Sequence, residues 1–211
     1  VTGGGGAGKS YTVVAFRDHL RRRGLLNMLV ALAPTGKAAI AMASDDIPPG
    51  KTYWSGLGFQ PISGPPAPGA PLNKTEQERR ELWKQHNVKF IVLDEVGMID
   101  AGGLDDVDKM CRRVTGADTY FGGLHVICSG DFSQKRPPEG LPVWDARVVD
   151  LASGTVAQGT AASTKANRNS MGRDVWDRVM SKDVIQLVET KRFDNDKQWG
   201  ELLERLRVGA C

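Results

Sequence analysis

Cysteine and histidine are scarce in this 211-residue chain, and neither follows the spacing of a metal-ligand set. The three cysteines, Cys111, Cys128 and Cys211, form an odd set, which argues against a disulfide framework and favours a reducing compartment. The three histidines are scattered along the chain. We therefore assign no metal site to these two residue types.

Long apolar runs and a strong net charge are also missing. No apolar run approaches the roughly 18 residues of a membrane span, and no signal peptide is recognisable, so we expect no membrane partner. The net charge of +3 is compatible with a nucleic-acid partner but does not indicate one. With 40% hydrophobic and 25% charged residues, the chain has the composition of one good-sized globular domain.

Glycine, by contrast, is concentrated in the first ten residues, which fit the phosphate-loop pattern G-x-x-x-x-G-K-[ST]. Glycines let backbone N–H groups turn inward around an oxyanion, and the following helix directs its positive end toward it. Lys9 would reach the β- and γ-phosphates, and the Ser10 hydroxyl would bind Mg²⁺. The pattern therefore predicts an ATP site formed by Gly3, Gly4, Gly5, Gly6, Ala7, Gly8, Lys9, Ser10 and Tyr11. A chance glycine-rich linker is the alternative.

Apolar segments of strand and helix character alternate along the chain. We expect strands at 28–33, 90–93, 124–128 and 184–188, and helices at 11–23, 37–44, 75–85, 100–113, 175–180 and 197–207. Segments 56–72 and 153–172 are rich in Gly and Pro or in small polar residues, and we expect both to be loops. Alternation of this kind predicts an α/β fold with a parallel sheet covered by helices on both faces and a ligand at the carboxyl ends of the strands.

Two further motifs follow expected strands. Phe90–Leu93 leads into Asp94 and Glu95, so Asp94 would hold Mg²⁺ opposite Ser10, and Glu95 would orient or deprotonate the attacking water. Two solvated acids at a strand end are the alternative. After the next strand, Gln134 ends a Gly-Asp-Phe-Ser-Gln segment, where it would sense the γ-phosphate; an ordinary turn is the alternative.

The ordered set of motifs resembles the Pif-type, RecD-like DNA helicases of superfamily one. It comprises Gly3–Ser10, Ala33–Ala39, Asp94–Met98, Phe121–Gly123, Gly130–Gln134 and the segment from Leu187 to Phe193. The resemblance implies the first motor domain of an enzyme that uses ATP to move 5′-to-3′ on single-stranded DNA. It also implies the usual settings of such helicases: DNA repair, recombination and telomere maintenance, in a nucleus, a mitochondrion or a bacterial cytoplasm.

The same resemblance assigns further residues. Arg192 matches an arginine that faces the triphosphate as a cis finger, although a surface arginine is the alternative reading. The DNA-binding set is Pro34, Thr35, Gly36, Lys37, Thr52 and Trp54. Trp54 stands where the family usually has histidine, and it would either stack on a base or pack beneath the Pro-rich loop.

One departure from the family pattern bears on function. The segment Gln134-Lys135-Arg136 is longer and more basic than the family pattern, which raises the alternative of a nucleotide-controlled DNA-binding module without motor activity. A phosphate-loop ATPase that never touches DNA is a weaker alternative. We also expect residues 1–211 to form a single RecA-like domain cut from a longer chain at both ends, with a second RecA-like domain elsewhere in that chain.

Overall fold

The computed structural model describes residues 1–58, 66, 69–145, 148, 161–188 and 195–207. Its strands are β1 (Thr2–Gly3), β2 (Leu29–Ala33), β3 (Lys51–Thr52), β4 (Phe90–Leu93), β5 (His125–Cys128) and β6 (Gln186–Leu187). Its α-helices are α1 (Lys9–Arg22), α2 (Gly36–Ala41), α3 (Tyr53–Leu57), α4 (Lys74–Gln85), α5 (Ala101–Thr115), α7 (Ala161–Val175) and α8 (Lys197–Arg207). Short helical turns are η1 (Leu26–Met28), η2 (Val96–Met98), η3 (Tyr120–Gly123) and η4 (Trp176–Met180).

All pairs among the strands of the described residues are parallel. Four strands pair in the order β3-β2-β4-β5, and β1 pairs with β6. A parallel bridge from Thr2 to Gly130 joins β1 to the chain just after β5, so the two sheets continue each other. The carboxyl ends of the strands therefore meet along one edge, as the sequence pattern predicted.

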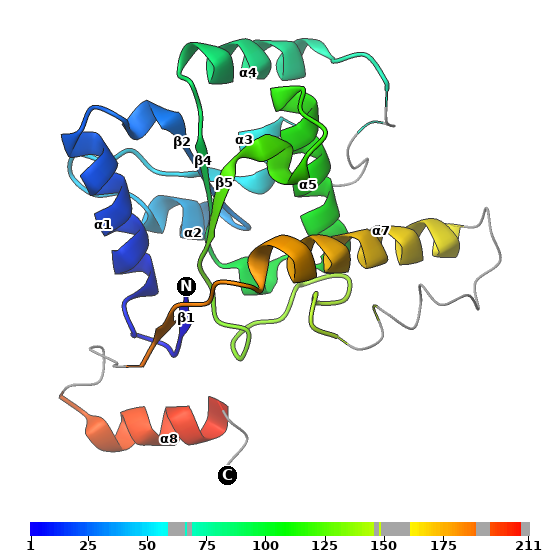
Figure 1. Ribbon diagram of the computed structural model, residues 1–211. Coiled ribbons are helices and arrows are strands. Elements are labelled where there is room, and N and C mark those ends of the chain that lie inside the picture. Colours follow the sequence, from blue (N-terminus) through cyan, green and yellow to red (C-terminus); the bar gives the residue numbers. More distant parts are fainter. Residues whose placement is uncertain (59–65, 67–68, 146–147, 149–160, 189–194, 208–211) are drawn as a thin grey trace.

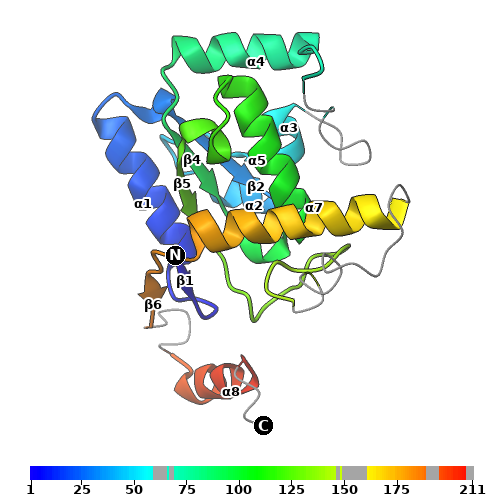
Figure 2. The same cartoon turned by 45° about the vertical axis from the view of Figure 1, so that its right-hand side comes forward.

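Helices cover both faces of this sheet (Figures 1 and 2). Side chains alternate along the central strands because successive residues of a strand point to opposite faces. One core cluster, on the α1 and α2 side, contains Val13, Ala31, Ala33, Ala39, Met42 and Val92. The larger cluster, on the side of α3, α4 and α5, includes Leu32, Leu57, Ile91, Leu93, Leu104 and Val107. The predicted α/β architecture is confirmed.

A buried ion pair fixes α4 against α5. Asn73 and Glu76 form a capping box at the start of α4, and the Glu76 side chain is fully buried. Arg113 of α5 donates to Glu76 Oε2 over 2.8 Å, and this contact lowers the pKa of the Glu76 carboxyl. Within the described part of the chain, no helix is long and apolar enough to cross a membrane.

The predicted loop at 153–172 is wrong for its second half. Residues 161–172 belong to α7, which lies against α5 in both ribbon views (Figures 1 and 2). A Cβ on Gly172 would lie 1.7 Å from the Ala101 carbonyl oxygen, so only glycine permits this close approach of the two helices. Residues 153–160 lie outside the described residues. The loop predicted at 56–72 begins later than expected, because α3 extends to Leu57.

Candidate nucleotide and DNA site

The glycine-rich segment turns from β1 directly into α1. Gly8 is the N-cap of α1 with φ of 94°, a left-handed conformation that favours glycine. At Gly3 the requirement is space, since a Cβ there would lie 2.6 Å from the carbonyl oxygen of Leu187 in β6. The loop therefore curls tightly at the start of a 14-residue helix, where backbone N–H groups attract an anion.

Lys9 holds its ammonium group inside this loop. Its Nζ donates to the carbonyl oxygens of Gly3 at 2.8 Å and Gly4 at 3.0 Å. Ser10 follows in the first turn of α1 with an exposed side chain, and the Tyr11 side chain is 78% exposed. The Lys9 ammonium therefore lies at the loop beside the start of α1, where a phosphate group would meet positive charge.

Asp94 and Glu95 lie at the carboxyl end of β4, and their electrostatics connect them to Lys9. Burial raises the pKa of the Asp94 carboxyl, while the nearby Ser129 hydroxyl and the Lys9 ammonium act in the opposite direction. Burial, and secondarily the negative charge of Asp94, raises the pKa of the Glu95 carboxyl. The positive charge of Lys9 acts in the opposite direction. The two acids therefore lie within electrostatic reach of the phosphate-loop lysine.

Glu95 also has a strained backbone. Its φ of 50° places a non-glycine residue in the left-handed region, one residue beyond Asp94 at the end of the buried strand β4. The turn is held from the next strand, because the Val96 N–H donates to the Ser129 carbonyl over 3.0 Å. Such strain persists only where neighbouring structure enforces it, and here it sets the direction in which Glu95 leaves the sheet.

Gln134 comes from the turn after β5 and lies over the phosphate loop. A Cβ on Gly5 would lie 3.6 Å from Gln134 Nε2. The turn that carries it is stabilised by Asp131, whose Oδ1 accepts from the Ser133 N–H over 2.9 Å. This turn packs on the Asp94 turn through backbone, since a Cβ on Gly97 would lie 2.9 Å from the Asp131 carbonyl oxygen. Three motifs that are distant in sequence thus meet at one edge of the sheet.

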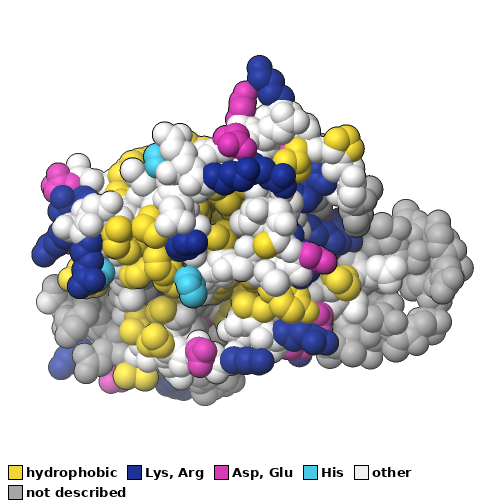
Figure 3. All heavy atoms as spheres, turned by 45° about the horizontal axis from the view of Figure 1, so that its top comes forward, with side chains coloured by type: hydrophobic (Ala, Val, Ile, Leu, Met, Phe, Trp, Pro, Cys, Tyr) yellow, Lys and Arg dark blue, Asp and Glu magenta, His cyan; other side chains and the backbone are white. Residues whose placement is uncertain are grey.

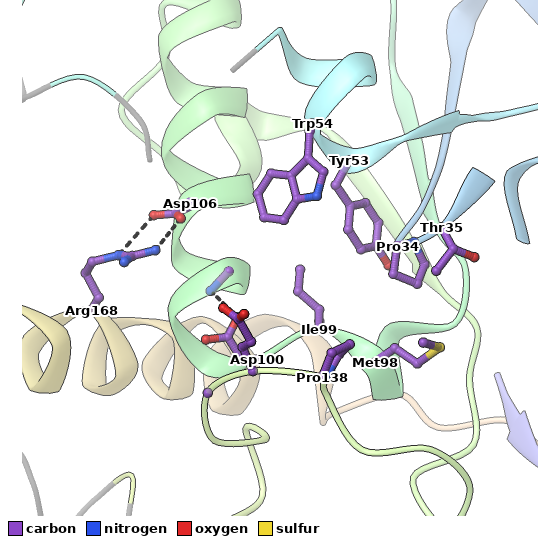
Figure 4. Close-up of a pocket in the computed structure, with 13 residues that line it drawn as sticks. Pro34, Thr35, Tyr53, Trp54, Met98, Ile99, Asp100, Asp106, Pro138 and Arg168 are labelled. Atoms are coloured by element: carbon purple, nitrogen blue, oxygen red, sulfur yellow. Dashed lines mark hydrogen bonds and ion pairs between the residues drawn. The ribbon is translucent and has the colours of Figure 1, made fainter. Parts of the chain in front are cut away.

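The predicted DNA-binding residues follow β2 and β3 at the same edge. Thr35 caps α2, its Oγ1 accepting from the Ala38 N–H over 3.2 Å, and Gly36 and Lys37 are exposed in the first turn. Thr52 caps α3, its Oγ1 accepting from the Ser55 N–H over 3.2 Å. Both threonine hydroxyls thus already act as helix caps. Pro34 and Trp54 line a cavity beside these caps (Figure 4).

Tyr53 links this side to the acids, and the sequence reasoning missed it. Its side chain is buried to 99%, and its hydroxyl donates to the Asp94 carbonyl over 2.7 Å. Burial raises the pKa of Tyr53 well above its ordinary value, so the hydroxyl stays protonated as a donor. Nothing in the local pattern reveals this partner, which lies 41 residues away. Arg192, the predicted arginine finger, lies outside the described residues.

The sequence of the chain matches the model of a known protein family. The family model described as PIF1-like helicase matches residues 1–144. The chain belongs to the PIF1-like helicase family. The resemblance that the ordered motifs suggested is therefore confirmed.

Individual PIF1-like relatives agree with this membership. The chain is 26% identical over 213 residues to the ATP-dependent DNA helicase PIF1 of Xenopus laevis, covering 100% of this chain and 27% of that protein. It is 28% identical over 137 residues to the ATP-dependent DNA helicase Pif1 of Bdellovibrio bacteriovorus, covering 65% of this chain and 28% of that protein. The chain thus spans less than a third of either curated relative.

A solved structure supports the fold. The crystal structure of Pif1 helicase from Bacteroides in complex with ADP-AlF3 and ssDNA superposes with a TM-score of 0.64 at 23% identity, over 100% of this chain and 42% of that one. The fold is that of a RecA-like α/β domain.

Proposed function

We propose that this chain is an ATP-binding and ATP-hydrolysing motor domain of a DNA helicase that moves 5′-to-3′ on single-stranded DNA. The observation that carries the proposal is the meeting of the phosphate loop, the Asp94-Glu95 turn and Gln134 at one sheet edge, with Gln134 Nε2 within 3.6 Å of a Cβ position on Gly5. The curated relatives are named ATP-dependent DNA helicases, and one similar solved structure holds ADP-AlF3 with ssDNA.

The residues fit Mg²⁺-ATP. Mg²⁺ prefers oxygen ligands and commonly takes only one or two from the protein, with phosphate and water completing its shell. The Ser10 hydroxyl and the Asp94 carboxylate would supply these ligands, while Lys9 and the loop amides hold the phosphates. Bound Mg²⁺ neutralises charge on the reacting phosphates. Glu95 then orients the attacking water, and Gln134 contacts the γ-phosphate.

The DNA would lie against the caps of α2 and α3, where Pro34–Lys37, Thr52 and Trp54 lie. Exposed N–H groups at the start of α2 would contact a backbone phosphate. Figure 3 turns the α4 end of the molecule toward the viewer, and on that face Lys and Arg side chains are interspersed with Asp and Glu rather than gathered into one basic surface. Coupling of ATP to DNA would run through Tyr53, which joins the Thr52–Trp54 segment to the backbone of Asp94.

Two proposals concern the longer polypeptide. Arg192 would supply positive charge to the transferring phosphoryl group. A second RecA-like domain would pack near α8, where Trp199, Leu202 and Leu206 expose 40–53% of their surface at helical spacing. The protein would act where its DNA is: a nucleus, a mitochondrion or a bacterial cytoplasm.

Nucleotide binding tests the proposed site directly. We expect a fluorescent ATP analogue to bind the chain in the presence of Mg²⁺, and Lys9→Ala to weaken this binding at least tenfold through loss of a charge-assisted contact. Lys84→Ala, which removes the same group from the exposed face of α4, is the matched control. Equal binding by wild type and Lys9→Ala would refute the assignment of the loop.

A further inference from the structure

A cavity of about 730 Å³ adjoins the proposed DNA-binding residues. This volume lies within the range of about 300–1,000 Å³ that small-molecule pockets occupy. Figure 4 shows the Trp54 ring and Pro34 on one side and the Asp106–Arg168 pair on the other, with Ile99 and Pro138 below the Trp54 ring. The lining thus joins α3 and the end of β2 to α5 and α7, elements that sequence reasoning did not connect.

The charge of this cavity is unusual for a surface that faces DNA. Its lining includes three carboxylates, from Asp100, Asp106 and Glu139, and one guanidinium, from Arg168. Arg168 is already paired, because its Nε and Nη2 both donate to the Asp106 carboxylate. A phosphate entering the cavity would therefore meet net negative charge and be repelled. A neutral group with N–H donors and an aromatic face is the chemistry that the lining accepts.

We propose that the cavity takes one nucleobase of the bound single strand and prefers cytosine to thymine. The Trp54 ring offers a stacking surface, and the carboxylates of Asp100 and Glu139 accept hydrogen bonds from exocyclic amines such as the N4 amine of cytosine. Thymine has no exocyclic amine, and its single N3–H donor lies between two carbonyl oxygens that these carboxylates would repel. This inference rests on the proposed single-strand binding and adds base preference to it.

Asp100 is the residue through which the preference is tested. It caps α5, its Oδ1 accepting from the Gly103 N–H over 3.0 Å. Asparagine is an equally good N-cap, so Asp100→Asn removes the charge while keeping the helix start. Asp45→Asn removes the same charge from an exposed position after α2 and serves as the matched control.

The experiment is fluorescence anisotropy of the 211-residue chain with labelled 12-mers of dC, of dT and of abasic sugar-phosphate, at one fixed salt concentration and pH 8. We expect dC to bind about tenfold more tightly than dT, and the abasic strand to bind most weakly. Asp100→Asn should reduce the dC/dT ratio at least threefold, whereas Asp45→Asn leaves it unchanged. Trp54→Ala should weaken binding of dC but not of the abasic strand.

The outcomes separate this inference from the proposed function. Equal binding of all three strands would overturn the base-binding cavity while leaving single-strand binding in place. A dC/dT ratio that Asp100→Asn does not change would do the same. Failure of every strand to bind would overturn both the cavity and the proposed DNA-binding function.

Discussion

Replacement of Tyr53 by phenylalanine tests the link between the two halves of the site. The hydroxyl is buried, and it donates to the Asp94 carbonyl over 2.7 Å. Its removal loses a hydrogen bond that contributes about 1 kcal/mol net to the free energy of unfolding. Because the buried carbonyl also loses this donor, we expect a total destabilisation of about 2 kcal/mol. For a domain of this size each kcal/mol lowers Tm by about 2–4 °C, so we expect a decrease of about 6 °C.

Thermal unfolding followed by circular dichroism measures this effect. Tyr11→Phe is the matched control for stability, because it removes the same hydroxyl from a side chain that is 78% exposed. If Tyr53→Phe lowers Tm no more than Tyr11→Phe does, the hydrogen bond contributes nothing. We also expect Tyr53→Phe to reduce the stimulation of ATP turnover by single-stranded DNA more than it reduces basal turnover. Equal reduction of the two rates would remove Tyr53 from the coupling path.

Three further outcomes follow from the site. Lys9→Ala should abolish ATP turnover, measured as phosphate release, and retained turnover would exclude the phosphate-loop role. Glu95→Gln should keep ATP-analogue binding but slow hydrolysis at least a hundredfold, because general-base catalysis contributes about 10²–10⁴-fold; unchanged hydrolysis would place the base elsewhere. Burial raises the pKa of Asp106 from 3.8 to about 6 against the opposing charges of Arg168 and Lys109, with Asp105 adding to the rise. The fold therefore favours protonated Asp106, and the stability this gives is present below about pH 4 and lost as pH rises through about 6. One pKa unit corresponds to 1.36 kcal/mol, so the free energy of unfolding of Asp106→Asn in urea should rise relative to that of wild type by about 3 kcal/mol between about pH 4 and pH 7. A difference between the two proteins that does not change with pH would refute this.

The sequence predicted where the phosphate loop, the Asp94-Glu95 pair and Gln134 lie in the fold, because each motif is local and its spacing is specific. A lysine after a glycine-rich turn, and two acids after a wholly apolar strand, each indicate a position at the end of a strand. Parallel pairing then brings these ends to one edge without further information. The start of α5 was also predicted, since the helix expected from residue 100 begins with Asp100 as its N-cap, the Asp100 Oδ1 accepting from the Gly103 N–H.

What the sequence concealed depends on long-range contacts. Segment 161–172 is polar and reads as a loop, yet it forms a helix because Gly172 allows contact with α5 and Arg168 pairs with buried Asp106. The sequence also did not predict that charged residues of α5 are buried, because their ion-pair partners lie on other turns of α5 or on other helices. On α4 the two adjacent apolar residues differ, since Leu82 is 45% exposed while Trp83 is buried, and the apolar character of the two does not distinguish them.

The most direct test of the proposed function is ATP turnover by the longer polypeptide that contains this domain, with and without a single-stranded oligonucleotide. We expect strong stimulation by the oligonucleotide, abolished by Lys9→Ala. Turnover that ignores DNA would contradict the motor assignment and leave an ATPase without a DNA role. DNA binding without any turnover would contradict it in favour of a nucleotide-controlled DNA-binding module.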